Sequence, residues 1–150
     1  MEIPREIQSA INIASKTNYL NTDYQYLKNV QITEWDIKSA GLSVLKFRKL
    51  LSPEELDKLS KMDKHNRTVK EGLLQKSNPK VAEEIINTLS KVRQAFVLLN
   101  QIEAHQIMTI KKDAIFLINK RPDVKVIKDY FEFREKNTYT SVMVLGKKEF

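Results

Sequence analysis

Two aspartates occur where the sequence predicts that strands end, and aspartate can hold a divalent metal ion. Asp36 follows the β-branched run "VQITEW", and Asp113 occupies the polar corner between "QIMTI" and "AIFLIN". If these three strands are neighbours in one sheet, both carboxylates emerge at the same edge. Mg²⁺ needs few protein carboxylates because it keeps waters and takes ligands from substrate phosphates. Two such ions, about 4 Å apart, can clamp an in-line phosphoryl transfer.

Each aspartate also has a structural explanation. Asp36 can cap a helix that begins near Lys38, and Asp113 can favour a tight turn. From spacing alone this structural use is the commoner one, and the choice stays open at this point. His65 and His105 are far apart in sequence and lack flanking ligands at zinc-site spacing, which argues against a zinc site.

The first segments of the chain predict a helix and then the strand that ends at Asp36. Pro4 stands at a first helical position, and apolar residues keep to one face over residues 4–15. β-branched residues alternate with polar ones in the strand that follows. Trp35, on the opposite strand face from Asp36, is expected in the core.

Helical signals dominate the stretch between this strand and the hairpin. Ser52 is the expected N-cap of one helix, with Pro53 at its first position and Glu55 completing a capping box. Asn78 and Pro79 begin a second, long helix. The core face of that helix is expected to contain Val81, Ile85, Leu89, Val92, Phe96, Leu98 and Leu99.

After the hairpin, two strands are expected over residues 124–134 and 138–145, separated by the turn-prone "EKN". The predicted fold class is therefore α+β, an antiparallel sheet with helices packed on one face. We expect an N-terminal helical segment (1–28) and a sheet domain (29–150) with a helical insertion at about 52–78.

The composition indicates a folded chain that suits acidic partners. Its 150 residues are enough for one domain with a core of its own. With 26 Lys plus Arg against 19 Asp plus Glu, the formal net charge is +7, which favours phosphate-rich partners without identifying one. Cysteine is absent, which excludes disulfides and cysteine-based zinc sites.

No apolar run approaches the roughly 20 residues of a membrane span. The N-terminus "MEIPREIQSA" also lacks the basic-then-apolar order of a signal peptide. We therefore expect no membrane partner and a cytoplasmic location.

The stretch "DIKSAGLSVL" resembles the first palm motif of family B DNA polymerases. That motif has an Asp, a Ser three positions later and another Ser four beyond that, a pattern matched by Asp36, Ser39 and Ser43. "TIKKDAIFLI" resembles the hairpin motif of the same palm, and Asp113 with the three residues after it matches that pattern. The long helix and the strand order also agree. The resemblance runs from about Val30 to the C-terminus and extends to short phage-encoded polymerase-like proteins.

Two looser similarities follow along the chain. "RTVKEG", with Arg67 and Lys70, looks like the basic helix that contacts the phosphates of the incoming nucleotide in these polymerases. "REKNTYTS", with Lys136 and Tyr139, is similar to the late motif that holds the primer end.

The resemblance implies metal-dependent nucleotidyl transfer to a primer 3′-hydroxyl. Asp36 and Asp113 would be the catalytic ligands of Mg²⁺ or Mn²⁺, and the basic helix would neutralise a nucleoside triphosphate. The partner would be a primer–template. Phosphoryl transfer needs mostly positioning and charge stabilisation, which metals and cations supply.

The sequence also departs from the family pattern. Lys111 replaces the first of two aspartates in the hairpin motif. Together with Lys112 it would stabilise the Asp113 carboxylate and attract phosphate, and it would also compete with a metal cation. Gly41 replaces the aromatic residue beneath the incoming sugar, so sugar discrimination by that side chain is not expected. No exonuclease motif or thumb is recognised, and a protein partner would have to supply the missing subdomains.

Two other functions stay open. A non-catalytic replication accessory protein with a palm-like fold would bind nucleic acid in a salt-dependent way without Mg²⁺. A phage structural or interaction protein would carry its charge incidentally. In both cases Arg67 and Lys70 can simply face solvent, and Lys136, Lys147 and Lys148 can protect a strand edge from pairing.

Overall fold

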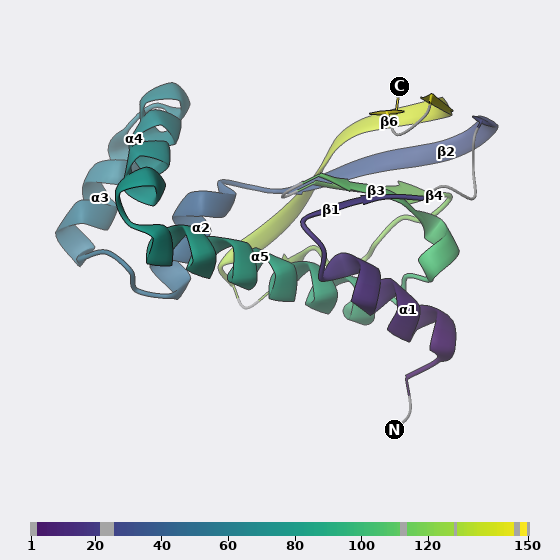
Figure 1. Cartoon of the computed structure of the whole chain (residues 1–150), viewed down its shortest axis with the longest axis horizontal. Helices are drawn as coiled ribbons and strands as arrows, with labels where there is room; N and C mark the ends of the chain where they lie inside the picture. The colour runs from purple at the N-terminus through teal and green to yellow at the C-terminus, as the bar shows by residue number, and fades with distance from the viewer. Residues whose placement is uncertain (1–2, 22–25, 112–113, 128, 146–147, 150) are drawn as a thin grey trace.

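The computed structural model describes residues 3–21, 26–111, 114–127, 129–145 and 148–149, with the side chains of 26–29 and 140–149 left out. Strands form one antiparallel layer and the long helix lies across one of its faces, so the α+β fold class is confirmed (Figure 1). In chain order the elements are α1 (Arg5–Ala14), β1 (Asn18–Leu20), β2 (Tyr26–Ile37), α2 (Ala40–Phe47), α3 (Pro53–Lys61), α4 (Lys64–Ser77), α5 (Pro79–Leu99), a 3₁₀ turn (Ala104–Gln106), β3 (Ile107–Lys111), β4 (Ala114–Ile118), β5 (Val126–Ile127), β6 (Phe131–Leu145) and β7 (Lys148–Glu149).

The described strands are ordered β1-β3-β4-β2-β6-β5, and β7 pairs with β6. Strand β2 lies between β4 and β6, antiparallel to both, and its Asp36 pairs with Ala114 on one side and Arg134 on the other. Strands β3 and β4 form the expected hairpin. Its corner residues, Lys112 and Asp113, lie outside the described residues. The expectation that the first strand and the hairpin are neighbours in one sheet is confirmed.

The expected turn at "EKN" is wrong, because β6 runs through it without interruption. Glu34 pairs with Asn137, and the register then shifts by one residue, which leaves Lys136 as the extra residue of a β-bulge. A bulge, like a turn, takes one residue out of the regular ladder, so turn-prone residues can occur within it. The chain reverses earlier instead, where Asp129 has a φ of 58° and β5 pairs back on β6.

Helix α5 supplies the centre of the core. The ring of Phe96 stacks on that of Phe133 in β6, with centroids 3.8 Å apart, and both side chains are buried. Trp35 is only 1% exposed, so its expected place in the core is confirmed. The predicted core face of α5 is confirmed as far as Phe96 and is wrong for Leu98 and Leu99, which are 42% and 53% exposed. Leu98 lies about 200° around the helix from Phe96, which turns it away from the sheet.

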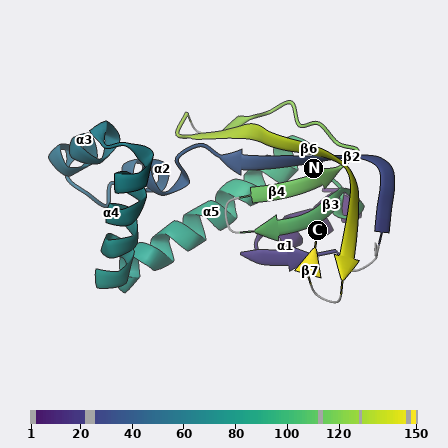
Figure 2. The same cartoon turned by 90° about the horizontal axis from the view of Figure 1, so that it is seen from above.

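Both predicted helix starts are confirmed. The backbone N–H of Glu55 donates to Ser52 Oγ at 3.2 Å and completes the capping box of α3. Asn78 Oδ1 accepts from the backbone N–H of Lys80 at 3.2 Å and caps α5. Between these points, α3 and α4 stand beyond the end of the sheet layer (Figures 1 and 2). Helix α4 contains no buried residue.

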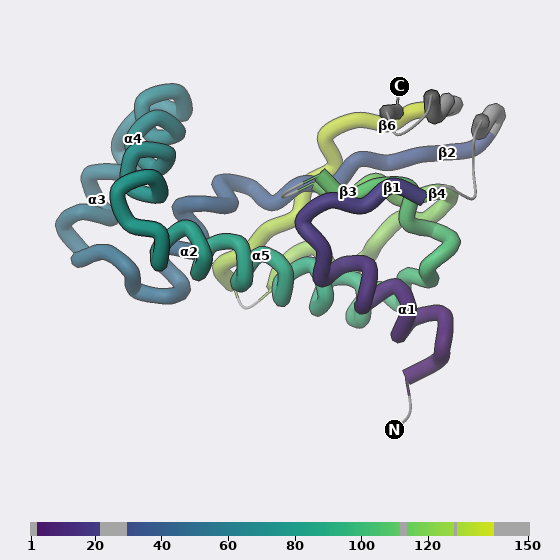
Figure 3. Tube along the Cα trace, in the orientation of Figure 1, coloured from purple at the N-terminus to yellow at the C-terminus, as the bar shows by residue number. Residues whose placement is uncertain are grey.

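The N-terminal segment packs on the helical layer. Arg93 of α5, which is 2% exposed, donates to the carbonyl oxygens of Ala14 (3.0 Å) and Lys16 (2.8 Å) at the end of α1. Strand β1 then extends the sheet beside β3. Helices α1 and α5 therefore share one face of the sheet, and no described helix lies over the other (Figure 3). None of the described helices is long and apolar enough to cross a membrane.

Candidate metal and nucleic-acid site

The sheet face away from α5, called the open face below, carries both carboxylates and cations. Along β2, Trp35 and Ile37 belong to the main core with α5. Because side chains alternate along a strand, Glu34 and Asp36 belong to the open face. Strand β6 runs beside them and places Arg134 opposite Asp36.

Asp36 is held by an ion pair. Arg134 Nε donates to Asp36 Oδ1 at 3.3 Å, and the Asp36 side chain is 13% exposed. Its second carboxylate oxygen makes no hydrogen bond to a described residue. Asp36 does not cap the following helix, because it lies within β2 and the N-cap of α2 is Ser39, with a left-handed φ of 47°. The structural explanation for Asp36 is thus a strand residue paired with arginine.

The residues on either side of the hairpin corner lie beside Asp36 in the sheet. Lys111, the last residue of β3, pairs with Ala114, the first of β4, and Ala114 pairs in turn with Asp36. Lys111 is exposed. Asp113 and Lys112, which the sequence assigned to the same site, are outside the described residues, but Asp113 is joined to Ala114 by one peptide bond.

Helix α4 brings Arg67 to the end of β2. Arg67 Nη2 donates to Ser39 Oγ at 3.3 Å, and Arg67 Nε lies 4.0 Å from Glu71 Oε1. The Glu71 carboxylate in turn faces Gly41, where a Cβ atom would lie only 2.8 Å from Glu71 Oε2. Gly41, expected beneath an incoming sugar, therefore leaves room for a carboxylate of the protein itself.

Glu71 is a site residue that sequence reasoning missed. Its Oε1 is buried without a hydrogen-bond partner. Burial raises the pKa of the Glu71 carboxyl above its usual value, and the nearby Arg67 guanidinium lowers that pKa in part. The spacing of Arg67 and Glu71, one helical turn apart, was the available signal. That spacing is common on solvated helices, so it did not distinguish this pair.

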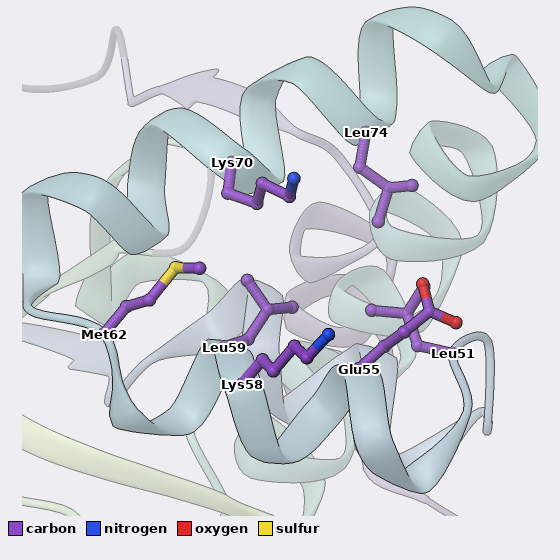
Figure 4. A pocket seen from close by; sticks show the side chains of 7 residues that line it. All are labelled: Leu51, Glu55, Lys58, Leu59, Met62, Lys70 and Leu74. Atoms are coloured by element: carbon purple, nitrogen blue, oxygen red, sulfur yellow. The ribbon is translucent and has the colours of Figure 1, made fainter.

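Lys70 lies at a different place from Arg67. It lines a pocket together with Leu74 of α4 and residues of α3 and its flanking loops, none of which belongs to β2 or α2 (Figure 4). Of the predicted phosphate-binding pair, Arg67 therefore lies at the end of β2, whereas Lys70 faces the pocket between α3 and α4.

Lys136 and Tyr139 gather around a second carboxylate that sequence reasoning missed. Glu34 is 7% exposed and its Oε1 accepts from Tyr139 Oη (2.9 Å) and Asn137 Nδ2 (3.1 Å). Lys136 Nζ lies 4.0 Å from Glu34 Oε2. The Tyr139 ring, 38% exposed, stacks on Phe116 with centroids 6.1 Å apart. A partly exposed aromatic ring with a cation beside it suits a nucleobase and its phosphate.

The described residues do not form a complete metal centre. No three histidine, aspartate or glutamate side chains gather among them in the manner of a metal centre. His105 pairs with Glu103, and His65 is exposed on α4. Asp36 pairs with Ala114 at the hairpin, and its Oδ2, which accepts no hydrogen bond from a described residue, suits a hard cation that takes its other ligands from water and phosphate.

Together the fold and the open face define an α+β domain with carboxylates, cations and a stacked aromatic pair on one side of a sheet. The model of the family described as "Bacteriophage PBS1 gene 130 protein" matches residues 9–150, and the chain belongs to this family. It is therefore a phage protein. No curated protein matches the chain, and no solved structure matches it.

Proposed function

We propose that the open face binds nucleic acid and that its Asp36 end carries out metal-dependent nucleotidyl transfer to a primer 3′-hydroxyl. The observation that carries the proposal is the pairing of Asp36 with Ala114. Ala114 lies beside Asp36 in the sheet and Asp113 directly precedes it in the sequence, which supports the proposal that the two aspartates act together. The strand order β3-β4-β2-β6 also supports a palm-like arrangement.

In this proposal Asp36 and Asp113 hold Mg²⁺ or Mn²⁺, which would stabilise negative charge on the transferred phosphoryl group. Arg67, beside Ser39, is the cation placed to contact the nucleoside triphosphate. Lys111 and Lys112 would bind the nucleic acid. The protein would act in the host cytoplasm. A protein partner would supply the subdomains that hold the duplex.

Lys136 and Tyr139 steady the primer strand in this proposal. The bulge in β6 brings Lys136 near Glu34, and the hydrogen bond from Tyr139 to Glu34 holds the phenol ring in one orientation. A fixed ring contributes stacking with less loss of side-chain freedom on binding.

Primer extension tests the proposal. The wild-type chain, a labelled primer–template and Mg²⁺ or Mn²⁺ are combined with deoxy- or ribonucleotides separately. Asp36→Asn is expected to lower incorporation about a hundredfold or more, because it removes a charged metal ligand. Asp57→Asn is the matched control, since Asp57 is an exposed aspartate paired with Lys61 on α3. Incorporation by Asp36→Asn at the wild-type rate would exclude the proposed role of Asp36.

One observation favours a second function, a nucleic-acid-binding accessory protein without turnover. Arg134 already occupies one oxygen of Asp36, as expected of a carboxylate kept for structure. In that case the primer–template binds without metal, no extension occurs with either kind of nucleotide, and Asp36→Asn binds as tightly as the wild type.

A further inference from the structure

Helices α3 and α4 hold an apolar pocket between them. Its volume is about 250 Å³, well above the space that one water molecule needs. Figure 4 shows the apolar side chains that form its walls: Leu51, Leu59, Met62 and Leu74. An apolar hollow of this size gains most from a bulky apolar group that removes its walls from water.

Two ammonium groups extend over this pocket. Lys58 comes from α3 and Lys70 from α4, and both line the hollow (Figure 4). Neither side chain has an ion pair or hydrogen bond with any described residue. The acidic side chain in the lining, Glu55, belongs to the capping box: its Oε1 accepts from the backbone N–H of Ser52 at 3.4 Å and also from Ser52 Oγ at 3.0 Å. The lining therefore carries two ammonium groups and one carboxylate, a net positive charge.

The outer surface of α4 is also both apolar and basic. Leu73, one turn beyond Lys70, is 59% exposed, and Val69 is 50% exposed. Lys64 and Lys76 are exposed on the same helix. The acidic residue of α4, Glu71, is turned against Gly41 and does not face solvent. Pocket and helix together form a surface that is both apolar and basic.

We infer that this surface, called the α3–α4 groove below, docks an acidic amphipathic segment of a partner protein. One bulky apolar side chain of that segment fills the pocket, and flanking carboxylates contact Lys58 and Lys70. Burial of the apolar side chain supplies most of the affinity, and the opposite charges set specificity and orientation.

Charge decides between this occupant and a second copy of the chain. A second α4 would bring another row of lysines against the first, and like charges at an interface are unfavourable. Nucleic acid would pair with the lysines, but its exposed aliphatic group is the thymine methyl, which is too small to fill a pocket walled by leucine and methionine. The inference does not rest on the proposed nucleotidyl transfer, because no residue of β2 or α2 lines the groove.

A displayed library of random peptides tests the inference on the full chain. Selection is made on the wild type, and the enriched peptides are measured by fluorescence anisotropy on individual variants. The expected peptides have net negative charge and one Leu, Met, Phe or Trp flanked by Asp or Glu. Lys58→Glu combined with Lys70→Glu is expected to weaken their binding about tenfold or more, because two attractive contacts become repulsive.

Lys64→Glu is the matched control, since it reverses a charge on α4 outside the pocket. It is expected to change the affinity less than the double variant does, and circular dichroism checks that both variants fold. On the wild type, the Met62 methyl resonance should shift as peptide is added. Failure to enrich acidic peptides, equal binding by the double variant, or a preference of the groove for a single-stranded oligonucleotide would each overturn the inference.

Discussion

At the scale of single residues, the contact of Glu71 with Gly41 links the insertion to the sheet domain. A Cβ at Gly41 would lie 2.8 Å from Glu71 Oε2, so the observed position of the Glu71 carboxylate depends on a residue without Cβ. Arg67 adds a contact to Ser39 from the same helix. The cost is an Oε1 atom of Glu71 that is buried without a hydrogen bond.

This burial makes stability depend on pH in a definite direction. The pKa of Glu71 is raised in the folded chain, chiefly by burial, above the ordinary value that it has when unfolded. The folded state therefore keeps the proton to higher pH than the unfolded state. The associated stability is fully present below the ordinary pKa, and it is lost as the pH rises through the raised one.

Glu71→Gln removes the loss of stability that accompanies ionisation of the Glu71 carboxyl. The variant is expected to be more stable than the wild type near neutral pH, by up to about 1 kcal/mol, because it no longer buries a charged carboxylate whose Oε1 lacks a hydrogen bond. The difference in free energy of unfolding should shrink as the pH falls towards about 4, where the wild-type carboxyl is protonated. Urea denaturation of both proteins over this pH range measures it. A difference that stays constant with pH would show that Glu71 does not titrate as described.

At the scale of elements, hydrogen bonds from one asparagine connect the end of α5 to the segment that precedes β5. Asn100 is 8% exposed, and its Nδ2 donates to the carbonyl oxygens of Phe96 and Val124 at 2.9 Å each. Its Oδ1 accepts from the backbone N–H groups of Asp123 (2.8 Å) and Val124 (2.7 Å). No described helix links β4 to β6, so this side chain replaces the packing that a helix would give.

Asn100→Ala is therefore expected to destabilise the chain by about 2–3 kcal/mol, since it leaves several part-buried backbone groups without partners. Asn12→Ala is the control, because Asn12 is exposed and its side chain accepts one bond from Gln8; a change within about 0.5 kcal/mol is expected there. Chemical denaturation midpoints compare the two. Equal midpoints would mean that the segment after β4 holds its place without Asn100.

At the scale of the whole molecule, the formal charge of +7 governs any association with nucleic acid. On the open face Arg134 is partly neutralised by its ion pair with Asp36. Lys136 is more exposed than Arg134: its side chain is 58% exposed, and its Nζ lies 4.0 Å from Glu34 Oε2. Its exposure leaves it able to contact a phosphate.

Binding of a single-stranded oligonucleotide should accordingly weaken as salt rises. Lys136→Ala is expected to reduce the magnitude of the slope of log affinity against log salt by about 0.7, the contribution of one phosphate contact on a single strand. Lys61→Ala, which removes a lysine paired with Asp57 on α3, is the control and should leave the slope unchanged. Fluorescence anisotropy titrations at several salt concentrations measure both. Equal slopes for the two variants would place the nucleic acid elsewhere.

The arrangement of elements separates two surfaces. The open face belongs to β2, β4 and β6, whereas the α3–α4 groove belongs to the insertion, which stands beyond the end of the sheet in two perpendicular views (Figures 1 and 2). A partner in the groove would therefore leave the open face accessible. The proposed nucleic-acid site and the proposed protein site can be tested independently for this reason.

The sequence by itself determined the features that depend on residues a few positions apart. The capping box at Ser52, the start of α5 at Asn78, the hairpin and the α+β class all follow from local patterns, and all agree with the structure. The bulge at Lys136 was misjudged as a turn, because the same residue types favour both and the partner strand decides between them.

Only the tertiary structure decided which groups meet. Arg134 reaches Asp36 across 98 residues of sequence, and Tyr139 reaches Glu34 across 105. Lys70 and Arg67 are three positions apart on one helix, yet they face different neighbours. Periodicity assigns a side chain to a face but not to a partner, because the partner is set by strand register and helix packing between segments that the local sequence does not relate.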